Sequence, residues 1–505
     1  MNELCNELCE PLSILFNTSL RTTEVPTQWQ EARVSAIFKK GKTNLACNYR
    51  PVSITCIICR VMETIIRDHI TSYLVKHNLL SKYQFGFLKG KSTTLQLLNV
   101  LNDWTQTIED KCSTDCLYMD YQKAFDTVPH KRLLSKLKSY NINKEILDWI
   151  SVYLNNRLQF VEVNGKRSKW LQVTSGIPQG SVLGPLLFLI YINDLPEKID
   201  STVYMYADDT KLYREIKCID DNKKLQEDLN ELKKWSDLWL LKFHPDKCFR
   251  ITIGKKKEYE FEYYITVENK LHEMSKVDEI RDIGVIIDSE LKFEKHINSK
   301  IQTANKILGI IRRSFMYLNC DIFIPLYKSL IRSHFDYAMI IWSPNLGKFI
   351  DSIESVQRRA TKMIPEIKNL SYPERLKYLN LPTLAYRRAR GDMIEVFKII
   401  SNIYNSNSTE QILTIRDKKH ISLRGHQFTL DHNRLYTSAR KRYFGNRVTN
   451  TWNSLPDYIV GAFSLNVFKN LLDILWSRQE LWYNYKANIN KKDYFIRRPE
   501  QFKQK

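Results

Sequence analysis

The stretch that most constrains this chain is Val203–Tyr213, where an apolar run stops at Asp208 and Asp209 and a second short apolar run follows. This pattern predicts a strand, a tight turn and a second strand. Successive strand side chains face opposite ways, so adjacent aspartates approach one point only where the chain bends. Two carboxylates at a hairpin tip favour a metal site with oxygen ligands. A solvated turn is the commoner explanation of an isolated Asp-Asp pair, so the metal site needs support from elsewhere in the chain.

The charge of the chain points to a polyanionic partner. The sequence has 505 residues, which is enough for about three domains of ordinary size. It contains 77 Lys and Arg against 56 Asp and Glu, a formal charge of +21. Such an excess suits nucleic acid, although a membrane surface also attracts basic proteins.

No segment predicts a membrane span or a secretory leader. The longest apolar run, Val182–Ile192, is far shorter than the roughly 18 residues that a spanning helix needs. Residues 1–20 carry acidic side chains where a signal peptide has basic ones. The ten cysteines are then expected to be reduced thiols, and the lone Cys56–Cys59 pair has no zinc partner at suitable spacing. We expect an intracellular protein, in the cytoplasm or the nucleus, without a membrane partner.

The segment Gln84–Thr93 is similar to a phosphate-binding loop but departs from that pattern. Only three residues separate Gly86 from the Gly-Lys-Ser sequence at 90–92, where the nucleotide-binding motif needs four. No clear apolar strand precedes the segment either. We interpret it instead as the start of a helix, with Thr93 as the N-cap and Gln96 at the capping-box position.

Other weak signals accompany the Asp-Asp stretch. An apolar run ends on Asp120, and Asn164-Gly165 lies between two β-rich runs, which predicts a hairpin. The segment Ser175–Phe188 has three glycines at intervals of four, and glycine allows close backbone approach. A basic loop follows a short strand near residues 35–50, and from residue 294 onward helical spacing dominates with several Arg and Lys pairs.

This order of motifs resembles the reverse transcriptase of non-LTR retrotransposons, most closely the jockey-like and related long interspersed element group. The resemblance spans residues 10–300 and continues, with less specific motifs, to about residue 475. It implies an α+β fold, a right-hand polymerase with fingers, an antiparallel-sheet palm, an α-helical thumb and a helical C-terminal region. The implied parts are an N-terminal helical extension (1–34), fingers and palm (35–290), a thumb (291–400), a linker (401–417) and a basic C-terminal region (418–505).

The resemblance also implies a set of catalytic carboxylates. The first catalytic motif of the family falls on Asp120, Ala124 and Phe125, and the last falls on Tyr206–Asp209. Asp120, Asp208 and Asp209 would hold two Mg²⁺ ions, with Asp209 as the third ligand. Phe125 resembles the bulky ring that excludes a ribose 2′-hydroxyl in this family.

The remaining implied site residues would bind substrates. Arg50 and Lys39 resemble the finger residues on the triphosphate, and Lys40 or Lys42 could serve in place of Lys39. Gln179 and Gly180 resemble the loop beneath the templating base pair. Lys247 resembles the residue proposed to donate a proton to pyrophosphate.

The implied function is RNA-directed DNA synthesis, with an RNA template, a DNA primer and dNTPs as partners. An RNA-dependent RNA polymerase shares the palm and is one alternative; an inactive retroelement remnant that only binds nucleic acid is another. Full-length members of the family carry an endonuclease that nicks target DNA. This chain begins directly before the polymerase motifs, so we expect a fragment or a truncated copy.

Overall fold

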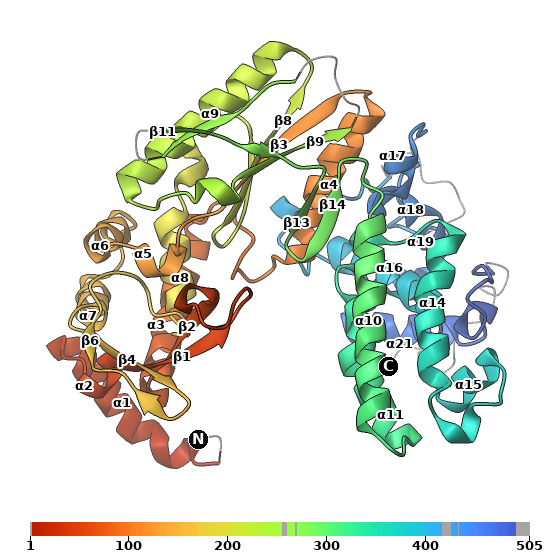
Figure 1. Cartoon of the computed structure of the whole chain (residues 1–505), viewed down its shortest axis with the longest axis horizontal. Helices are drawn as coiled ribbons and strands as arrows, with labels where there is room; N and C mark the ends of the chain where they lie inside the picture. The colour runs from red at the N-terminus through yellow and green to blue at the C-terminus, as the bar shows by residue number, and fades with distance from the viewer. Residues whose placement is uncertain (1–2, 255–259, 268–269, 417–425, 433, 491–505) are drawn as a thin grey trace.

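The centre of the molecule is a five-stranded palm sheet. Its strands are β3 (Ser113–Met119), β7 (Thr202–Tyr206), β8 (Asp209–Ile216), β9 (Phe249–Gly254) and β12 (Ser275–Lys276). Their order is β12-β9-β3-β8-β7, and Figure 1 shows the sheet at the top of the molecule. Strand β3 is antiparallel to both β8 and β9, and β7 is antiparallel to β8. The computed structural model describes residues 3–254, 260–267, 270–416, 426–432 and 434–490.

Both faces of the palm sheet are buried. Cys116 of β3 lies opposite Tyr213 and Ile251 in the neighbouring strands, and all three side chains belong to one hydrophobic core. Leu117 lies opposite Leu212, and this pair belongs to a second core on the other face. Because strand side chains alternate between faces, one sheet can separate two cores. The carboxylates at the strand ends are therefore carried on a rigid element.

A second sheet lies on the fingers side of the palm. It contains β1 (Glu31–Phe38), β2 (Tyr49–Ile54), β4 (Leu158–Val163), β5 (Lys166–Arg167) and β6 (Leu171–Gln172). Strand β1 is antiparallel to β2 and parallel to β4. Between β4 and β5, Asn164 and Gly165 have φ values of 51° and 78°. Positive φ at both positions is what a two-residue hairpin turn requires, so the predicted Asn-Gly hairpin is confirmed.

Helices surround these two sheets. They are α1 (Cys5–Thr22), α2 (Thr27–Gln30), α3 (Ile57–Lys76), α5 (Ala124–Thr127), α6 (His130–Ser139), α7 (Lys144–Leu154), α8 (Gly184–Ile192) and α9 (Ile219–Trp239). Short 3₁₀ turns occur at Ala46–Asn48, Leu195–Lys198 and Pro245–Lys247. Helix α8 is apolar on all sides and almost completely buried, as expected of a helix in the centre of a large protein.

Helix α4 (Thr93–Glu109) begins one residue earlier than predicted. Its N-cap is Ser92, whose Oγ accepts a hydrogen bond of 3.1 Å from the backbone N–H of Leu95. The prediction of Thr93 as the N-cap is therefore wrong, and Gln96 falls one residue beyond the capping-box position. Either hydroxyl can cap a helix, so the choice depends on the backbone angles before it. Ser92 has the extended angles that a cap requires.

Beyond the palm, two small hairpins lead into a helical region. The hairpins pair β10 (Tyr264–Val267) with β11 (Lys270–Glu273), and β13 (Glu279–Asp282) with β14 (Val285–Asp288). The helices that follow are α10 (Glu294–Ser314), α11 (Cys320–Leu326), α12 (Ser333–Asp336), α13 (Met339–Trp342), α14 (Gly347–Thr361), α15 (Tyr372–Tyr378) and α16 (Leu384–Ile400). Figure 1 shows α10 and α14 side by side on the right. A π-helical stretch, Tyr327–Arg332, joins α11 to α12, and a 3₁₀ turn covers Pro365–Ile367.

The C-terminal helices share one hydrophobic core with the thumb and α4. They are α17 (Ser438–Arg442), α18 (Phe444–Arg447), α19 (Thr449–Trp452), α20 (Asp457–Val460) and α21 (Leu465–Trp476), followed by a 3₁₀ turn at Glu480–Trp482. Phe397 of α16 stacks on Phe468 of α21 with ring centroids 4.3 Å apart. Arg440 donates to the backbone and side-chain oxygens of Asn102 in α4, each at 2.9 Å. The C-terminal part therefore packs against the palm helix as well as the thumb.

The segment predicted as a linker lies against the start of α4. The N–H of Asn405 donates to the carbonyl of Gly90 at 3.0 Å, and Asn99 donates to the carbonyl of Ser408 at 2.9 Å. Ser406–Ser408 form a 3₁₀ turn, and Ile412 is buried. The domain boundaries remain predictions. Within the predicted linker and C-terminal region, residues 417–425, 433 and 491–505 lie outside the described residues.

Candidate active site

The predicted Asp-Asp hairpin is present between β7 and β8. Tyr206 pairs with Asp209, so Ala207 and Asp208 alone form the turn. Ala207 has a φ of 54°, a conformation that residues other than glycine seldom adopt. Backbone strain of this kind persists only where the surroundings fix it, and it is concentrated at functional sites. The turn therefore places Asp208 at the tip of the hairpin.

The sheet register brings Asp120 to the same place. Strand β3 ends at Met119, which lies opposite Thr210 of β8, so Asp120 lies next to the start of β8. The carbonyl of Asp120 accepts a hydrogen bond of 2.8 Å from the N–H of His244. Its carboxylate forms a salt bridge with Lys247, with Nζ 2.9 Å from Oδ2. The segment His244–Lys247 thus holds Asp120 through both its backbone carbonyl and its carboxylate.

The carboxylates influence one another electrostatically. Burial raises the pKa of Asp208, the nearby Asp120 raises it further, and Arg50 and Lys39 oppose this rise. The pKa of Asp209 is raised to about 6, first because surrounding protein atoms desolvate its carboxylate and then because Asp208 and other carboxylates lie nearby. The residue is nevertheless exposed to solvent. Carboxylates that crowd one another favour a bound cation.

The fingers hairpin contributes positive charge to the same region. Arg50 lies opposite Ile37 in the β1–β2 ladder, and the N–H of Lys39 donates to the carbonyl of Asn48 at 2.8 Å. Both basic side chains are exposed, and both lower the pKa of Asp208, so they lie within electrostatic reach of its carboxylate. An exposed guanidinium and ammonium facing carboxylates can bind the phosphates of a ligand.

Phe125 lies on helix α5, five residues after Asp120. Its ring is half-buried and stacks on Phe188 of α8, with the centroids 4.4 Å apart. Its carbonyl accepts a hydrogen bond of 2.7 Å from the N–H of Ile177. The neighbouring Ala124 is buried beneath the site. The ring is therefore fixed in position by packing from below and by the glycine-rich loop.

The Gln179-Gly180 loop joins the fingers to the palm. The carbonyl of Gln179 accepts from the N–H of Ser53 in β2 at 2.7 Å, and its Nε2 donates to Asp126 at 2.9 Å. Gly180 has a φ of 117°, and a Cβ there would lie 2.5 Å from the carbonyl oxygen of Ser53. Only glycine fits this approach. Sequence reasoning did not single out Asp126, whose contact partner lies 53 residues away.

A buried ion pair supports the hairpin from the side. Lys211 of β8 pairs with Asp282 of β13, and both residues are buried. The hydroxyl of Tyr118 also donates to Asp282, at 3.0 Å. Asp282 is one of the carboxylates that raise the pKa of Asp209. The pair ties the β13–β14 hairpin to the strand that begins at Asp209, and the sequence carried no local signal for it.

Across the described residues, no three His, Cys, Asp or Glu side chains are placed so that together they could hold a metal ion. The same part of the chain contains no helix long and apolar enough to cross a membrane.

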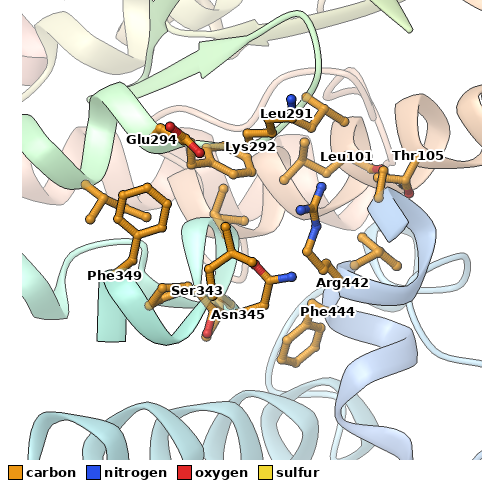
Figure 2. Close-up of a pocket in the computed structure, with 18 of the residues that line it drawn as sticks. Leu101, Thr105, Leu291, Lys292, Glu294, Ser343, Asn345, Phe349, Arg442 and Phe444 are labelled. Carbon is orange, nitrogen blue, oxygen red and sulfur yellow. Dashed lines mark hydrogen bonds between the residues drawn. The ribbon is translucent and has the colours of Figure 1, made fainter. Parts of the chain in front are cut away.

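A cavity of about 280 Å³ lies where α4, the start of α10 and α17 meet, away from the three aspartates. Figure 2 shows Arg442 and Leu101 among the side chains that line it.

The fold and the site together define a right-hand polymerase. Carboxylates stand at adjoining strand ends of an antiparallel palm, basic finger residues face them, and a helical region follows. Residues 37–287 match the family model described as reverse transcriptase (RNA-dependent DNA polymerase), and this part of the chain belongs to that family.

Relatives among the curated proteins agree with the resemblance to non-LTR retrotransposons. The chain is 27% identical over 378 residues to a probable RNA-directed DNA polymerase from transposon BS of Drosophila melanogaster, covering 70% of this chain and 40% of the relative. It is 26% identical over 368 residues to the RNA-directed DNA polymerase from mobile element jockey of the same species, covering 70% and 39%. The chain therefore spans about two fifths of the length of these relatives.

Among solved structures, apo telomerase from Candida Tropicalis aligns with this chain at a TM-score of 0.42 and 9% identity. The alignment covers 80% of this chain and 68% of that one. The likeness is too distant to inform the site.

Proposed function

We propose that the chain is an RNA-directed DNA polymerase of a mobile element, which extends a DNA primer on an RNA template with dNTPs. The observation that carries this proposal is the convergence of Asp120, Asp208 and Asp209 at the adjoining ends of β3, β7 and β8. Arg50 and Lys39, which belong to the fingers, lower the pKa of Asp208 through their positive charge. Carboxylates opposite phosphate-binding cations are the arrangement that phosphoryl transfer requires.

Asp120, Asp208 and Asp209 would hold two Mg²⁺ ions together with substrate phosphates and water, since no three described His, Cys, Asp or Glu side chains are placed to hold a metal ion by themselves. Asp120 and Asp208 are the principal ligands, and Asp209 is the third. The pKa values of Asp208 and Asp209 are both raised, in part by the neighbouring carboxylates, and such crowding favours a bound cation. A closed protein cage is not needed, because Mg²⁺ takes one or two carboxylates and completes its shell with water and substrate phosphates. Mg²⁺ held there would lower the pKa of the primer 3′-hydroxyl and would neutralise charge on the triphosphate and the leaving pyrophosphate.

The other site residues bind and orient the substrates. Arg50 and Lys39 hold the triphosphate of the incoming dNTP, and Gln179 with Gly180 forms the floor beneath the templating base pair. Lys247 lies close enough to Asp120 to meet the departing pyrophosphate, to which its ammonium group donates a proton. Tyr206 on the hairpin and the buried Ala124 of helix α5 complete the substrate-binding set.

Primer extension by the purified chain tests the function. A DNA primer annealed to an RNA template is incubated with either dNTPs or rNTPs, in Mg²⁺ or in EDTA. We expect Mg²⁺-dependent extension with dNTPs. Efficient extension with rNTPs alone would favour an RNA polymerase. Salt-dependent RNA binding without any extension would favour an inactive remnant.

Phe125 is proposed to exclude ribonucleotides by occupying the space of the 2′-hydroxyl. Phe125→Val is expected to weaken the preference for dNTPs over rNTPs by about 10- to 100-fold, because a removed steric barrier changes discrimination by a few kcal/mol. Single-nucleotide incorporation of matched dNTP and rNTP measures the ratio. Phe463→Val, which alters an exposed phenylalanine outside the site, serves as the control. An unchanged ratio in Phe125→Val would show that the ring is only a core residue.

A further inference from the structure

Gln84 contacts the active-site turn from a segment 123 residues earlier in the chain. Its buried side chain accepts a hydrogen bond from the N–H of Ala207 at 2.9 Å and donates to the carbonyl of Ala207 at 3.3 Å. Both backbone groups of the strained turn residue are therefore held by one amide. Gln84 begins the segment that resembles a phosphate-binding loop, and nucleotide binding does not explain this arrangement.

The backbone around Gln84 extends the contact. The N–H of Phe85 donates to the carbonyl of Met205 at 2.8 Å, and the N–H of Met205 donates to the carbonyl of Tyr83 at 2.9 Å. The Gln84 side chain also accepts from the N–H of Gly86 at 2.8 Å. The segment thus forms an isolated parallel bridge to the end of β7, between Gln84 and Met205.

Gly86 is required by the closeness of this packing. A Cβ at Gly86 would lie 2.5 Å from the backbone nitrogen of Ala207, a distance that real Cβ atoms essentially never show. The φ of Gly86 is outside the left-handed region, so alanine could adopt its backbone conformation. The glycine therefore serves the contact with the turn rather than a bend in its own segment.

Lys91 holds the Gln84 segment through hydrogen bonds to its backbone carbonyls. Its ammonium group donates to the carbonyls of Lys82 and Gln84, each at 2.8 Å, and to that of Ser81 at 3.4 Å. Burial lowers the pKa of Lys91 to about 8. A lysine whose three donors all bind backbone carbonyls acts as a support for the loop, which explains the Gly-Lys-Ser sequence without a nucleotide.

We propose that Gln84 is a positioning residue, which fixes the backbone of Ala207 through two hydrogen bonds and thereby aims the carboxylate of Asp208. The proposal rests on the proposed polymerase function for its kinetic consequence. Ala207 lies at a positive φ, so the turn relaxes unless its neighbours hold it. A small displacement of a catalytic group is enough to slow a reaction about 100-fold.

The test compares Gln84→Met with a matched control, Gln479→Met. Gln479 is also buried and also holds one residue by both backbone groups, since it accepts from the N–H of Asn490 at 2.7 Å and donates to its carbonyl at 2.9 Å. The control lies far along the chain from the turn. Both substitutions thus remove a buried side chain that holds both backbone groups of one residue, but only Gln84 holds the active-site turn.

Amide hydrogen exchange reports the contact without any need for activity. In the full chain, exchange at the peptide that contains Ala207 is expected to rise at least about tenfold in Gln84→Met and to remain unchanged in Gln479→Met. Unchanged exchange in Gln84→Met would overturn the proposal, whether or not the wild-type chain extends a primer. A wild-type chain without extension would instead overturn the proposed function.

The kinetics of dNTP incorporation then test whether the contact between Gln84 and Ala207 affects catalysis. In Gln84→Met, kcat for dNTP incorporation is expected to fall by about 10- to 100-fold, with KM for dNTP and the affinity for primer–template within twofold of wild type. If this variant fails to fold, Gly86→Ala replaces it, with Gly309→Ala as control because a Cβ there meets nothing within 4 Å. Equal kcat in the turn variants and their controls would overturn the positioning role.

Discussion

Asp120→Asn is expected to slow primer extension by roughly 10³-fold or more, because it removes one of the principal metal ligands and several kcal/mol of charge stabilisation. The variant also leaves Lys247 without the carboxylate that it contacts at 2.9 Å. Binding of primer–template is expected to remain within a few-fold of wild type. Single-nucleotide incorporation under Mg²⁺, alongside a binding titration, measures both quantities.

Two further variants separate the effects of charge and proton transfer near Asp120. Asp246→Asn removes an exposed carboxylate next to Lys247 and is expected to leave the rate unchanged. Lys247→Met is expected to lower the rate by about 100-fold or more, the usual contribution of a general acid. Asp120→Asn with a rate close to that of Asp246→Asn would contradict the assignment of Asp120.

Asp282→Ala is expected to lower the free energy of unfolding by about 3–5 kcal/mol, because it leaves Lys211 charged, buried and without its partner. Tyr118 also loses the acceptor for its hydroxyl. The β13–β14 hairpin would no longer be tied to the palm strand that begins at Asp209. Equilibrium denaturation of wild type and variant measures the difference.

The double variant Lys211→Met with Asp282→Leu provides the matched comparison. Replacing both charges by apolar side chains of similar size is expected to recover most of the stability, because the cost comes from an unpaired buried charge. Glu231→Ala, which breaks an exposed pair with Lys234, is expected to cost less than about 1 kcal/mol. If Asp282→Ala costs no more than Glu231→Ala, the buried pair does not stabilise the palm.

The parts of the site that the sequence predicted are those whose signal is local. Asp208 and Asp209 interrupt an apolar run, and Asp120 ends another, so each could be placed at a strand end. The resemblance to non-LTR reverse transcriptases then predicts that the three aspartates belong to one catalytic site. The sheet register brings Asp120 to the start of β8, beside the turn, and the basic fingers residues Arg50 and Lys39 reach the same carboxylates.

The parts that the sequence missed depend on partners far along the chain. Gln84 begins a segment whose glycines and Lys91 resemble a nucleotide-binding loop, whereas its contact is Ala207, 123 residues later. Asp282 contacts Lys211 across 71 residues. The N-cap of α4 was displaced by one residue because Ser92 and Thr93 carry the same capping group. Spacing along the chain cannot reveal the contacts of Gln84 and Asp282, because tertiary packing decides them, whereas the N-cap depends on local backbone angles.

The most direct test of the account is the Mg²⁺-dependent incorporation of one dNTP onto a DNA primer annealed to RNA, measured for wild type and Asp208→Ala side by side. The account predicts incorporation by the wild-type chain that requires Mg²⁺, and a loss of roughly 10³-fold or more in the variant with primer–template binding retained. Incorporation by Asp208→Ala at the wild-type rate would contradict the assignment of this hairpin as the catalytic centre.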